Sequence, residues 1–441
     1  MHSRRDFLGA LGLPAWGCAA PALARLVDAR LAGARHAVPR RAGAPGRVAQ
    51  DEDFWAQVGR NFTVDRSIVN LNNGGVSPAP AFVQDAVKAH LDLSNKAPSH
   101  YMWHVLEPQR EGVRQRLARA FGCDPEEVAV TRNASESLQT LQLGMDLRPG
   151  DEVLTTTQDY PRMITTFRQR ERREGVVLKQ FRIPTPCEDP QQVVQLYEQH
   201  ITPRTRLLLM CHVINLTGQI LPVREVVAMA RGRGIPVLVD GAHALAHLDF
   251  RISDLECDNY CSSLHKWLFA PVGTGFLHVK KDKIGAIWPL MAAAESQAGD
   301  IRKFEEIGTH PAANFLAIAE ALTFHEEIGP ARKLARLLHL RDWWARRLLR
   351  HGRVRLHTSL KPGTASGIAC VEIEGVEPAA LSSWLWSAHK ILVTPIVLGQ
   401  PESGTFEFQG IRVSPSVYTT LQELDRFCSA MEHVVQHGLP A

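Results

Sequence analysis

Near its middle the chain reads Ile235-Pro236-Val237-Leu238-Val239-Asp240-Gly241-Ala242-His243, and farther on Ser263-Leu264-His265-Lys266. The apolar run before Asp240 is typical of a strand buried on both faces of a sheet. Asp240 closes that strand, at the end where α/β proteins usually bind ligands. Lys266 follows another predicted strand. The sequence therefore places a carboxylate and an amine at the edge of one sheet, where each needs a partner once water is excluded.

The same alternation of short apolar runs and longer amphipathic stretches extends from residue 51 onward. It predicts an α/β layer fold with a mostly parallel central sheet. Beyond about residue 330 the pattern changes to a long Arg/Leu-rich helix and a few shorter strands, which predicts a smaller C-terminal domain. The predicted strands are 127–131, 151–156, 176–181, 206–211, 236–240, 258–262 and 275–279; predicted helices include 135–144, 161–174 and 223–232. The expected organisation is an N-terminal segment over 51–85, a large domain over 86–329 and a small domain over 330–441.

Charge and cysteine content exclude several classes of protein. The chain has 441 residues and a formal net charge of +4. The first fifty residues alone carry +6, so the remainder carries −2 and offers no broad basic face for nucleic acid. The eight Cys are too sparse for a disulfide scaffold.

The N-terminus has the pattern of an export signal. Ser3-Arg4-Arg5-Asp6-Phe7-Leu8 precedes an apolar stretch that ends in the small residues Ala22-Leu23-Ala24. Adjacent arginines in this setting resemble a twin-arginine signal, which is read by the translocase that exports folded proteins. We expect a signal peptide over 1–24, a loosely ordered linker over 25–50 and a periplasmic protein without stable membrane association.

Asp240 and Lys266 together suit a pyridoxal 5'-phosphate site. Desolvation beside the apolar Trp267-Leu268-Phe269 stretch would disfavour a charged amine at Lys266 and make it more nucleophilic. Asp240 would pair with the pyridine nitrogen of the cofactor. On these two residues alone, an ordinary strand-end Asp and a surface Lys would be the better explanation.

Further motifs favour the cofactor site. From about Asn72 to Tyr418 they follow one another in the order found in the class V aminotransferase family of fold type I pyridoxal phosphate enzymes, which the chain resembles. The resemblance implies that Lys266 forms the Schiff base and that Asp240 binds the ring nitrogen. It implies a phosphate site at the backbone of Ala134 and Ser135, in Arg132-Asn133-Ala134-Ser135 at the start of a helix, with the side chains of Ser263 and His265. Thr309 would reach the phosphate in the neighbouring subunit, which implies a homodimer.

Other residues take roles from the same resemblance. Tyr160 follows a predicted strand and would stack on the pyridine ring, with its hydroxyl available to the reacting centre. Asn215, with His243 near the same position, would contact the phenolic oxygen of the cofactor. Arg412, in Gly410-Ile411-Arg412-Val413, would hold the substrate carboxylate through two parallel hydrogen bonds. The turn Asn72-Asn73-Gly74-Gly75 would line the substrate side, with Asn73 and Gly74 as candidate contacts.

Three other motifs fail. His243 and His247 have the spacing of zinc ligands on one helical turn, but no Glu follows the first His, so we expect no metal site. Gly273-Thr274-Gly275 runs into a strand and lacks a third glycine, so it is no dinucleotide fingerprint. A cysteine desulfurase needs a mobile Cys before the carboxylate-binding Arg. Residues 391–410 contain no Cys and Cys370 is distant in the chain, so persulfide chemistry by that route is rejected.

The expected activity is chemistry at the α-carbon of an amino acid or peptide-borne amino acid. Transamination, epimerisation and β-elimination all remain open, because the cofactor supports each of them. The motifs resemble the isopenicillin N epimerase-like branch of the family. An exported enzyme or lyase that tailors a siderophore or another peptide is one alternative. A non-catalytic ligand-binding protein with this fold is another.

Overall fold

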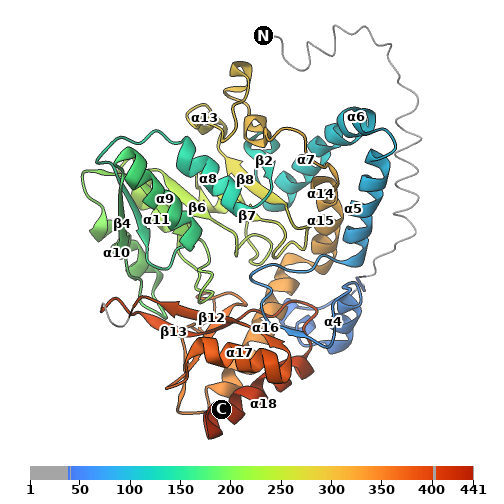
Figure 1. Ribbon diagram of the computed structural model, residues 1–441, viewed down its shortest axis with the longest axis vertical. Helices are drawn as coiled ribbons and strands as arrows, with labels where there is room; N and C mark the ends of the chain where they lie inside the picture. Colours follow the sequence, from blue (N-terminus) through green and yellow to red (C-terminus); the bar gives the residue numbers. More distant parts are fainter. Residues whose placement is uncertain (1–37, 40, 401–403, 441) are drawn as a thin grey trace.

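The centre of the molecule is a seven-stranded sheet in the order β2-β8-β7-β6-β5-β3-β4 (Figure 1). Its strands are Val128–Thr131 (β2), Glu152–Thr156 (β3), Val177–Phe181 (β4), Thr205–Cys211 (β5), Val237–Asp240 (β6), Asn259–Ser263 (β7) and Gly275–Val279 (β8). Each lies within one residue of its predicted boundaries. The sheet is mostly parallel, as the sequence predicted, but β8 runs antiparallel to both of its neighbours.

Successive side chains of the central strands enter two different cores. In β5, Leu208 and Met210 pack with one apolar cluster, whereas Leu207 and Leu209 pack with another. Because side chains alternate between the faces of a strand, both faces of this sheet are buried. Helices α8 (Ala134–Gly144) and α9 (Pro161–Glu174) cover one face. The other face is covered by α7 (Arg110–Phe121), α10 (Pro190–His200), α11 (Val223–Arg231) and α15 (Ile318–Ile328).

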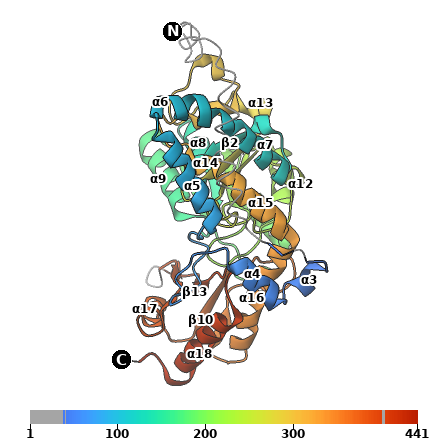
Figure 2. The ribbon, with the colours of Figure 1, turned by 90° about the vertical axis from the view of Figure 1, so that its right-hand side faces the viewer.

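A second, four-stranded antiparallel sheet lies at the other end of the molecule (Figures 1 and 2). Its order is β12-β13-β10-β9, and the long helix α16 (Pro330–Leu348) packs there against α18 (Leu421–His437). The remaining elements here are β9 (Val354–Leu356), β10 (Ala369–Ile373), α17 (Pro378–His389), β12 (Thr394–Leu398) and β13 (Phe408–Val413).

The N-terminal part of the chain packs beside the C-terminal part. Strand β1 (Val69–Asn70) pairs in parallel with β11 (Ile391–Leu392). The chain then continues into α5 (Ala81–Ser94), which packs beside α14 (Ala313–Leu316). The turn after β1 is thereby held against the small sheet.

The structure, a computed structural model, describes residues 38–39, 41–400 and 404–440. The signal peptide expected over 1–24 lies outside this range. The end of the expected linker differs from the prediction, because Pro45–Val48 forms a short helix, α3, and Val48 and Ala49 are buried. Arg336 of α16 holds this segment by donating a hydrogen bond to the Ala49 carbonyl at 3.0 Å. In the described part of the chain, no helix combines the length and the hydropathy needed to cross a membrane.

Candidate active site

The predicted site residues gather where the parallel strands of the large sheet end. Tyr160 follows β3, Asn215 follows β5, Asp240 ends β6 and Lys266 follows β7. Since the carboxyl ends of parallel strands share one edge, these residues surround a common cavity of about 340 Å³. The predicted residues that line it are Ala134, Ser135, Tyr160, Asn215, Asp240, His243, Ser263, His265 and Lys266; others are Gly75, Asn133, Leu138, Arg162, Cys211, Val213, Ala242, Val272 and Gly273.

Asp240 is held by the tight turn that follows β6. Its Oδ1 accepts a hydrogen bond from the Ala242 N–H at 2.9 Å, and the Gly241 N–H donates to the Cys261 carbonyl at 2.7 Å. A Cβ at Gly241 would lie 2.0 Å from the ring of Tyr260, so only glycine fits between this turn and β7. Burial raises the pKa of Asp240 to about 6, while the Ala242 N–H and the nearby Lys266 amine act in the opposite direction.

Lys266 brings an amine into the same cavity. Its Nζ lies 3.0 Å from Nε2 of His243. Burial lowers the pKa of Lys266 to about 8, and the charge of Asp240 opposes that shift. A substantial fraction of the amine is therefore neutral near pH 8, which is the nucleophilic form.

His243 has contacts with both ring nitrogens. Nε2 faces Lys266, and Nδ1 accepts a hydrogen bond from the Trp267 indole N–H at 3.4 Å. Burial is the largest of the effects that lower the pKa of His243 well below its ordinary value. The ring is therefore neutral at physiological pH.

The start of helix α8 forms the anion-binding end of the cavity. Asn133 caps the helix, and its Oδ1 accepts a hydrogen bond from the Glu136 N–H at 2.8 Å. The Ala134 N–H donates to Ser263 Oγ at 2.9 Å, so Ser263 rather than the cavity takes this donor. Ser135 lies in the first turn, where backbone N–H groups lack helical acceptors and the helix dipole favours an anion. This arrangement leaves the backbone N–H of Ser135 and the Ser263 hydroxyl at the cavity wall, where an anion could be bound.

Arg412 belongs to β13 of the small sheet and does not line this cavity itself, but it contacts Asn215, which does. Its guanidinium donates to Asn72 Oδ1 at 2.7 Å and to the Asn215 carbonyl at 3.2 Å. The buried Nε of Arg412 has no hydrogen-bond partner among the described residues. Burial lowers the pKa of Arg412 to about 10, with Tyr160 among the groups that oppose the shift. The guanidinium therefore keeps its charge, while its Nε is covered by the protein.

The Asn72–Gly75 turn contributes through different residues from those predicted. Asn73 is fully buried, and its amide binds the Asn70 and Ser414 carbonyls and the Tyr418 hydroxyl. Asn73 is thus committed to the protein interior, and the neighbouring Asn72 contacts Arg412 instead. Gly74 packs against Ser414 and His243, where a Cβ would lie 3.1 Å from Ser414 Oγ. Gly75, rather than Gly74, lines the cavity.

Two residues considered in the sequence analysis, Thr309 and Cys370, do not line this cavity. Thr309 is outside the cavity, in a shallow depression beside Met102, Trp103 and Glu107. Cys370, distant from Arg412 in the chain, lies directly opposite it in the small sheet, on β10. The Cys370 thiol is fully buried, and burial raises its pKa well above the ordinary range. It is therefore poorly suited to act as a nucleophile despite its position.

Contacts from separate parts of the chain were not predicted. Thr394, which receives a 3.3 Å hydrogen bond from Arg412, is a residue of β12 with no motif around it. Trp267 contacts His243. Because Trp267 directly follows Lys266, its position in the sequence could have indicated a place at the site. The sequence predicts Asn73 as the contact residue of this turn, whereas the structure shows that Asn72 contacts Arg412. The sequence does not indicate which Asn of the turn faces Arg412.

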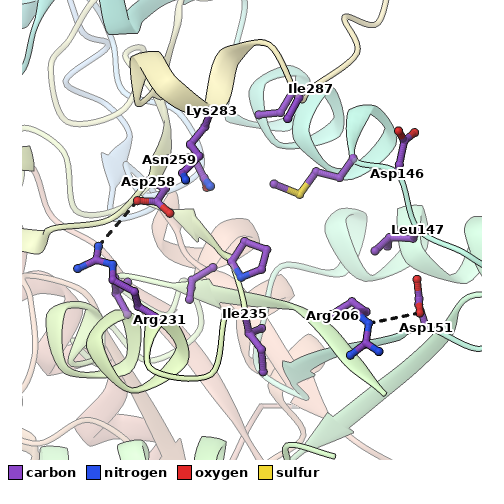
Figure 3. Close-up of a pocket in the computed structure, with 16 residues that line it drawn as sticks. Asp146, Leu147, Asp151, Arg206, Arg231, Ile235, Asp258, Asn259, Lys283 and Ile287 are labelled. Carbon is purple, nitrogen blue, oxygen red and sulfur yellow. Dashed lines mark ion pairs between the residues drawn. The ribbon is translucent and has the colours of Figure 1, made fainter. Parts of the chain in front are cut away.

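A larger cavity of about 610 Å³ opens at the opposite edge of the sheet, where β6 and β7 begin (Figure 3). None of the predicted site residues lines it. Its charged rim is partly paired, with Arg231 and Asp258 3.8 Å apart and Arg206 and Asp151 3.7 Å apart. The titratable groups with perturbed pKa values that face one another, Asp240, His243 and Lys266, all line the smaller cavity, which is the better candidate for catalysis.

Asp240 makes the stability of the cofactor-free protein depend on pH. Its pKa is higher in the folded chain than in the unfolded chain, so the folded state binds more protons between about pH 4 and 6. The free energy of unfolding should therefore fall as the pH rises through this window, by about 3 kcal/mol from this group. In Asp240→Asn that contribution should be absent. Denaturant unfolding of both apoproteins across the window measures the difference.

The same substitution at the exposed Asp53 provides a matched control. Equal pH dependence in the wild type and in Asp240→Asn would contradict the assigned environment of Asp240.

Known proteins resemble this chain over most of its length. A model of the aminotransferase class-V family matches residues 69–427. Isopenicillin N epimerase from Streptomyces clavuligerus is 32% identical over 400 residues, which cover 86% of this chain and 98% of the epimerase. The isopenicillin N epimerase of Amycolatopsis lactamdurans is 30% identical over 399 residues, with the same two coverages.

Solved structures share the fold. The cysteine desulfurase CsdA from Escherichia coli aligns with a TM-score of 0.74 at 20% identity, covering 90% of this chain and 99% of that one. A C-DES variant with glycine linked covalently to its pyridoxal phosphate aligns with a TM-score of 0.72 at 22% identity, covering 84% and 97%. The fold is that of the type I pyridoxal phosphate enzymes, and pyridoxal 5'-phosphate is the cofactor, as the sequence predicted. The chain belongs to the class V aminotransferase family.

Proposed function

We propose that this protein removes and returns a proton at the α-carbon of an amino acid or peptide-borne amino acid, in an epimerase-type reaction. The observation that carries the proposal is the Lys266 amine, which has a lowered pKa and shares one cavity with Asp240 and Tyr160. The similarity to two isopenicillin N epimerases over nearly their whole length favours epimerisation over the other reactions of the family. Transamination is the second candidate, since it begins with the same proton removal.

The residues of the cavity fit the cofactor. Buried polar atoms are almost always hydrogen-bonded, yet Oδ1 of Asn215 and Nδ1 of His265 have no partner within the described ranges. Both residues line the cavity, and Ser135 adds an N–H at the helix start. Ser135, Ser263 and His265 would hold the phosphate, while Asn215 and His243 would face the ring substituents. Bound there, pyridoxal phosphate supplies an electron sink for negative charge at the α-carbon.

Lys266 and Asp240 have separate tasks in this arrangement. The Lys266 amine is neutral often enough to bind the cofactor and, once released by substrate, to act as a base. Asp240 is buried beside the predicted position of the cofactor ring. A protonated ring nitrogen there would favour the ionised form of the Asp240 carboxylate. That pairing keeps the ring poor in electrons, and it explains why an acidic group is buried at the end of β6.

Inversion at the α-carbon requires a proton to leave one face and return to the other. Lys266 follows β7 and Tyr160 follows β3, and the sheet order places β6 and β5 between them. With neighbouring strands about 4.8 Å apart, these two groups approach Asp240 from opposite sides. We propose Lys266 and Tyr160 as the two proton-transfer groups.

Substrate is positioned by the arginine of the small sheet. Arg412 has a charged guanidinium held by Asn72 and by Asn215, a residue of the cavity, and this suits a carboxylate. Persulfide transfer is disfavoured, because residues 391–410 contain no Cys and the Cys370 thiol is buried. A lyase or an enzyme that tailors a siderophore or another peptide remains compatible with the same Arg412 contact. A purely ligand-binding role would not explain why both Lys266 and Asp240 are present.

The reaction can be read from products. Holoenzyme incubated in deuterium oxide with a panel of L-amino acids and short peptides should return substrate that carries deuterium at the α-carbon and the inverted configuration. Mass spectrometry and chiral chromatography measure both. Formation of oxo acid with the pyridoxamine form would indicate transamination, and pyruvate would indicate elimination; either result replaces the epimerase proposal.

Two variants separate the roles of the proton-transfer groups. Lys266→Ala should lose borohydride-stable attachment of the cofactor and α-proton exchange altogether. Tyr160→Phe should keep exchange, because Lys266 is intact, but inversion should fall by about a hundredfold or more, the usual scale for one acid–base group. Borohydride attachment that persists in Lys266→Ala would overturn the assignment of the lysine.

We also propose that the active unit is a homodimer in which Thr309 completes the partner's phosphate site. The proposal is supported by the position of Thr309 outside the cavity of its own chain, near the exposed Trp103. Lys266→Ala and Thr309→Asp should each be inactive alone, since the second places a carboxylate beside the phosphate. Refolded together in equal amounts, they should regain about a quarter of the wild-type sites, as random pairing in a twofold dimer requires.

No recovery from this mixture, or a monomer by light scattering, would contradict the shared site. Mixing Lys266→Ala with itself provides the matched control.

We propose export of the folded protein through the twin-arginine pathway to the periplasm. The support is Arg4-Arg5 followed by an apolar stretch and Ala22-Leu23-Ala24. Replacing both arginines by lysine keeps the charge but removes the paired guanidinium groups that characterise the signal. Cell fractionation should find the wild type in the periplasm and the double variant in the cytoplasm. Equal export of both proteins would reject this route.

A further inference from the structure

The side chain of Trp267 is fully buried directly behind the catalytic lysine. Its ring packs on His247 with centroids 3.8 Å apart and the two ring planes tilted by 33°. Its backbone carbonyl accepts a hydrogen bond from the buried Lys333 amine. The residue is therefore held both at the ring and at the main chain, and its one polar side-chain atom has a fixed direction.

His247 forms a rigid base for that stack. Nε2 of His247 accepts a hydrogen bond from the Gly367 N–H at 3.0 Å, so the ring proton must be on Nδ1. Nδ1 then donates to the His243 carbonyl at 3.0 Å. Both nitrogens of His247 are satisfied, and burial lowers its pKa to about 3, so this ring stays neutral. The indole of Trp267 therefore packs on the His247 ring, which is neutral and is held in place by hydrogen bonds at both nitrogens.

The indole N–H decides where His243 carries its proton. A Trp indole can only donate, and it points to Nδ1 of His243 at 3.4 Å. Nδ1 must therefore be the bare nitrogen, and a neutral His243 carries its proton on Nε2. That proton points at Nζ of Lys266, 3.0 Å away. Only an amine with a free lone pair can accept it, because an ammonium has no acceptor.

We propose that Trp267 is a positioning residue which fixes the tautomer of His243 and thereby holds Lys266 as the neutral amine that captures the cofactor. The inference rests on Lys266 being the cofactor-binding residue, as proposed above. The indole N–H favours the hydrogen bond in which His243 Nε2–H donates to Lys266 Nζ over the one in which Lys266 donates to His243 Nε2. With the indole N–H removed, His243 is free to move its proton to Nδ1, and Nε2 then accepts from a Lys266 ammonium.

Other charges around Lys266 act on the same equilibrium and would remain unchanged. Asp240 and Cys211 favour the ammonium, whereas Arg412 and burial oppose it. His265 adjoins Lys266 in the chain, while Arg412 and His247 are the other charged or titratable groups that act on His243. A substitution at Trp267 that keeps an aromatic ring leaves all of these in place, so any change in Lys266 reports on the lost N–H.

The test uses the full-length apoprotein and Trp267→Phe, which retains a ring for stacking and removes the donor. The rate at which each protein captures pyridoxal phosphate is measured from pH 6 to 11. We expect the midpoint of the pH profile to rise by roughly one unit in Trp267→Phe, so that capture at pH 7 falls about tenfold. At the alkaline end of the profile, where Lys266 is neutral in both proteins, the rates should converge.

A double-mutant comparison removes the tautomer from the system. Leucine at position 243 has no hydrogen-bonding group, so adding Trp267→Phe to His243→Leu should leave the capture midpoint of His243→Leu unchanged. A purely structural role for Trp267 would instead lower stability in both backgrounds without moving either midpoint. An unchanged midpoint in Trp267→Phe with a wild-type His243 overturns the proposal.

Nitrogen NMR of the wild-type apoprotein tests the proposal without relying on a variant that has to fold. The His243 signals, assigned by their loss in His243→Gln, should show a protonated Nε2 and a bare Nδ1. A proton on Nδ1 overturns the inference. This outcome is distinct from failure of the proposed function, because borohydride attachment at Lys266 and α-proton exchange are measured separately.

Discussion

Keeping an amine inside protein, away from water, is the constraint around which this site is organised. Lys266 lies among groups that push its charge in opposite directions, with burial and Arg412 against it and Asp240 in favour. Asp240 is subject to the same opposition with the sign reversed. The charge of each group offsets only part of the cost of burying the other. The pKa values of Asp240 and Lys266 therefore lie near neutral pH, at about 6 and about 8. That balance gives a lysine at the end of β7 the reactivity that a surface lysine lacks.

Much of the fold could be predicted because the central strands are buried on both faces. The central positions of such a strand are apolar, and this pattern is clear at 207–211 and 237–239. The direction of β8 had no such signal, because an antiparallel strand inside the sheet has the same composition as its parallel neighbours. The helix at Pro45–Val48 was missed for a related reason. Its order comes from contacts with Arg336 far along the chain rather than from its own composition.

The candidate site divides in the same way. Residues within continuous motifs, such as Asp240, His243 and Lys266, could be selected because strand, turn and side chain are adjacent in sequence. The substrate side is built between the turn after β1 and the small sheet, so the choice between Asn72 and Asn73 depends on which amide meets Arg412. Local sequence carries no information on that contact. The nearness of Cys370 to Arg412 escaped notice for the same reason, since strand pairing rather than chain distance sets it.

The pairing of β1 with β11, together with the Asn72–Arg412 hydrogen bond, has a consequence for how the protein is made. The two partners of that hydrogen bond are 340 positions apart. A ribosome must therefore release almost the entire polypeptide before Arg412 can contact Asn72, whereas the segments that carry Asp240 and Lys266 have left the tunnel much earlier. Biosynthesis thus orders the two sides of the site in time: the nascent chain can bring Asp240 and Lys266 together while Arg412 has yet to be translated.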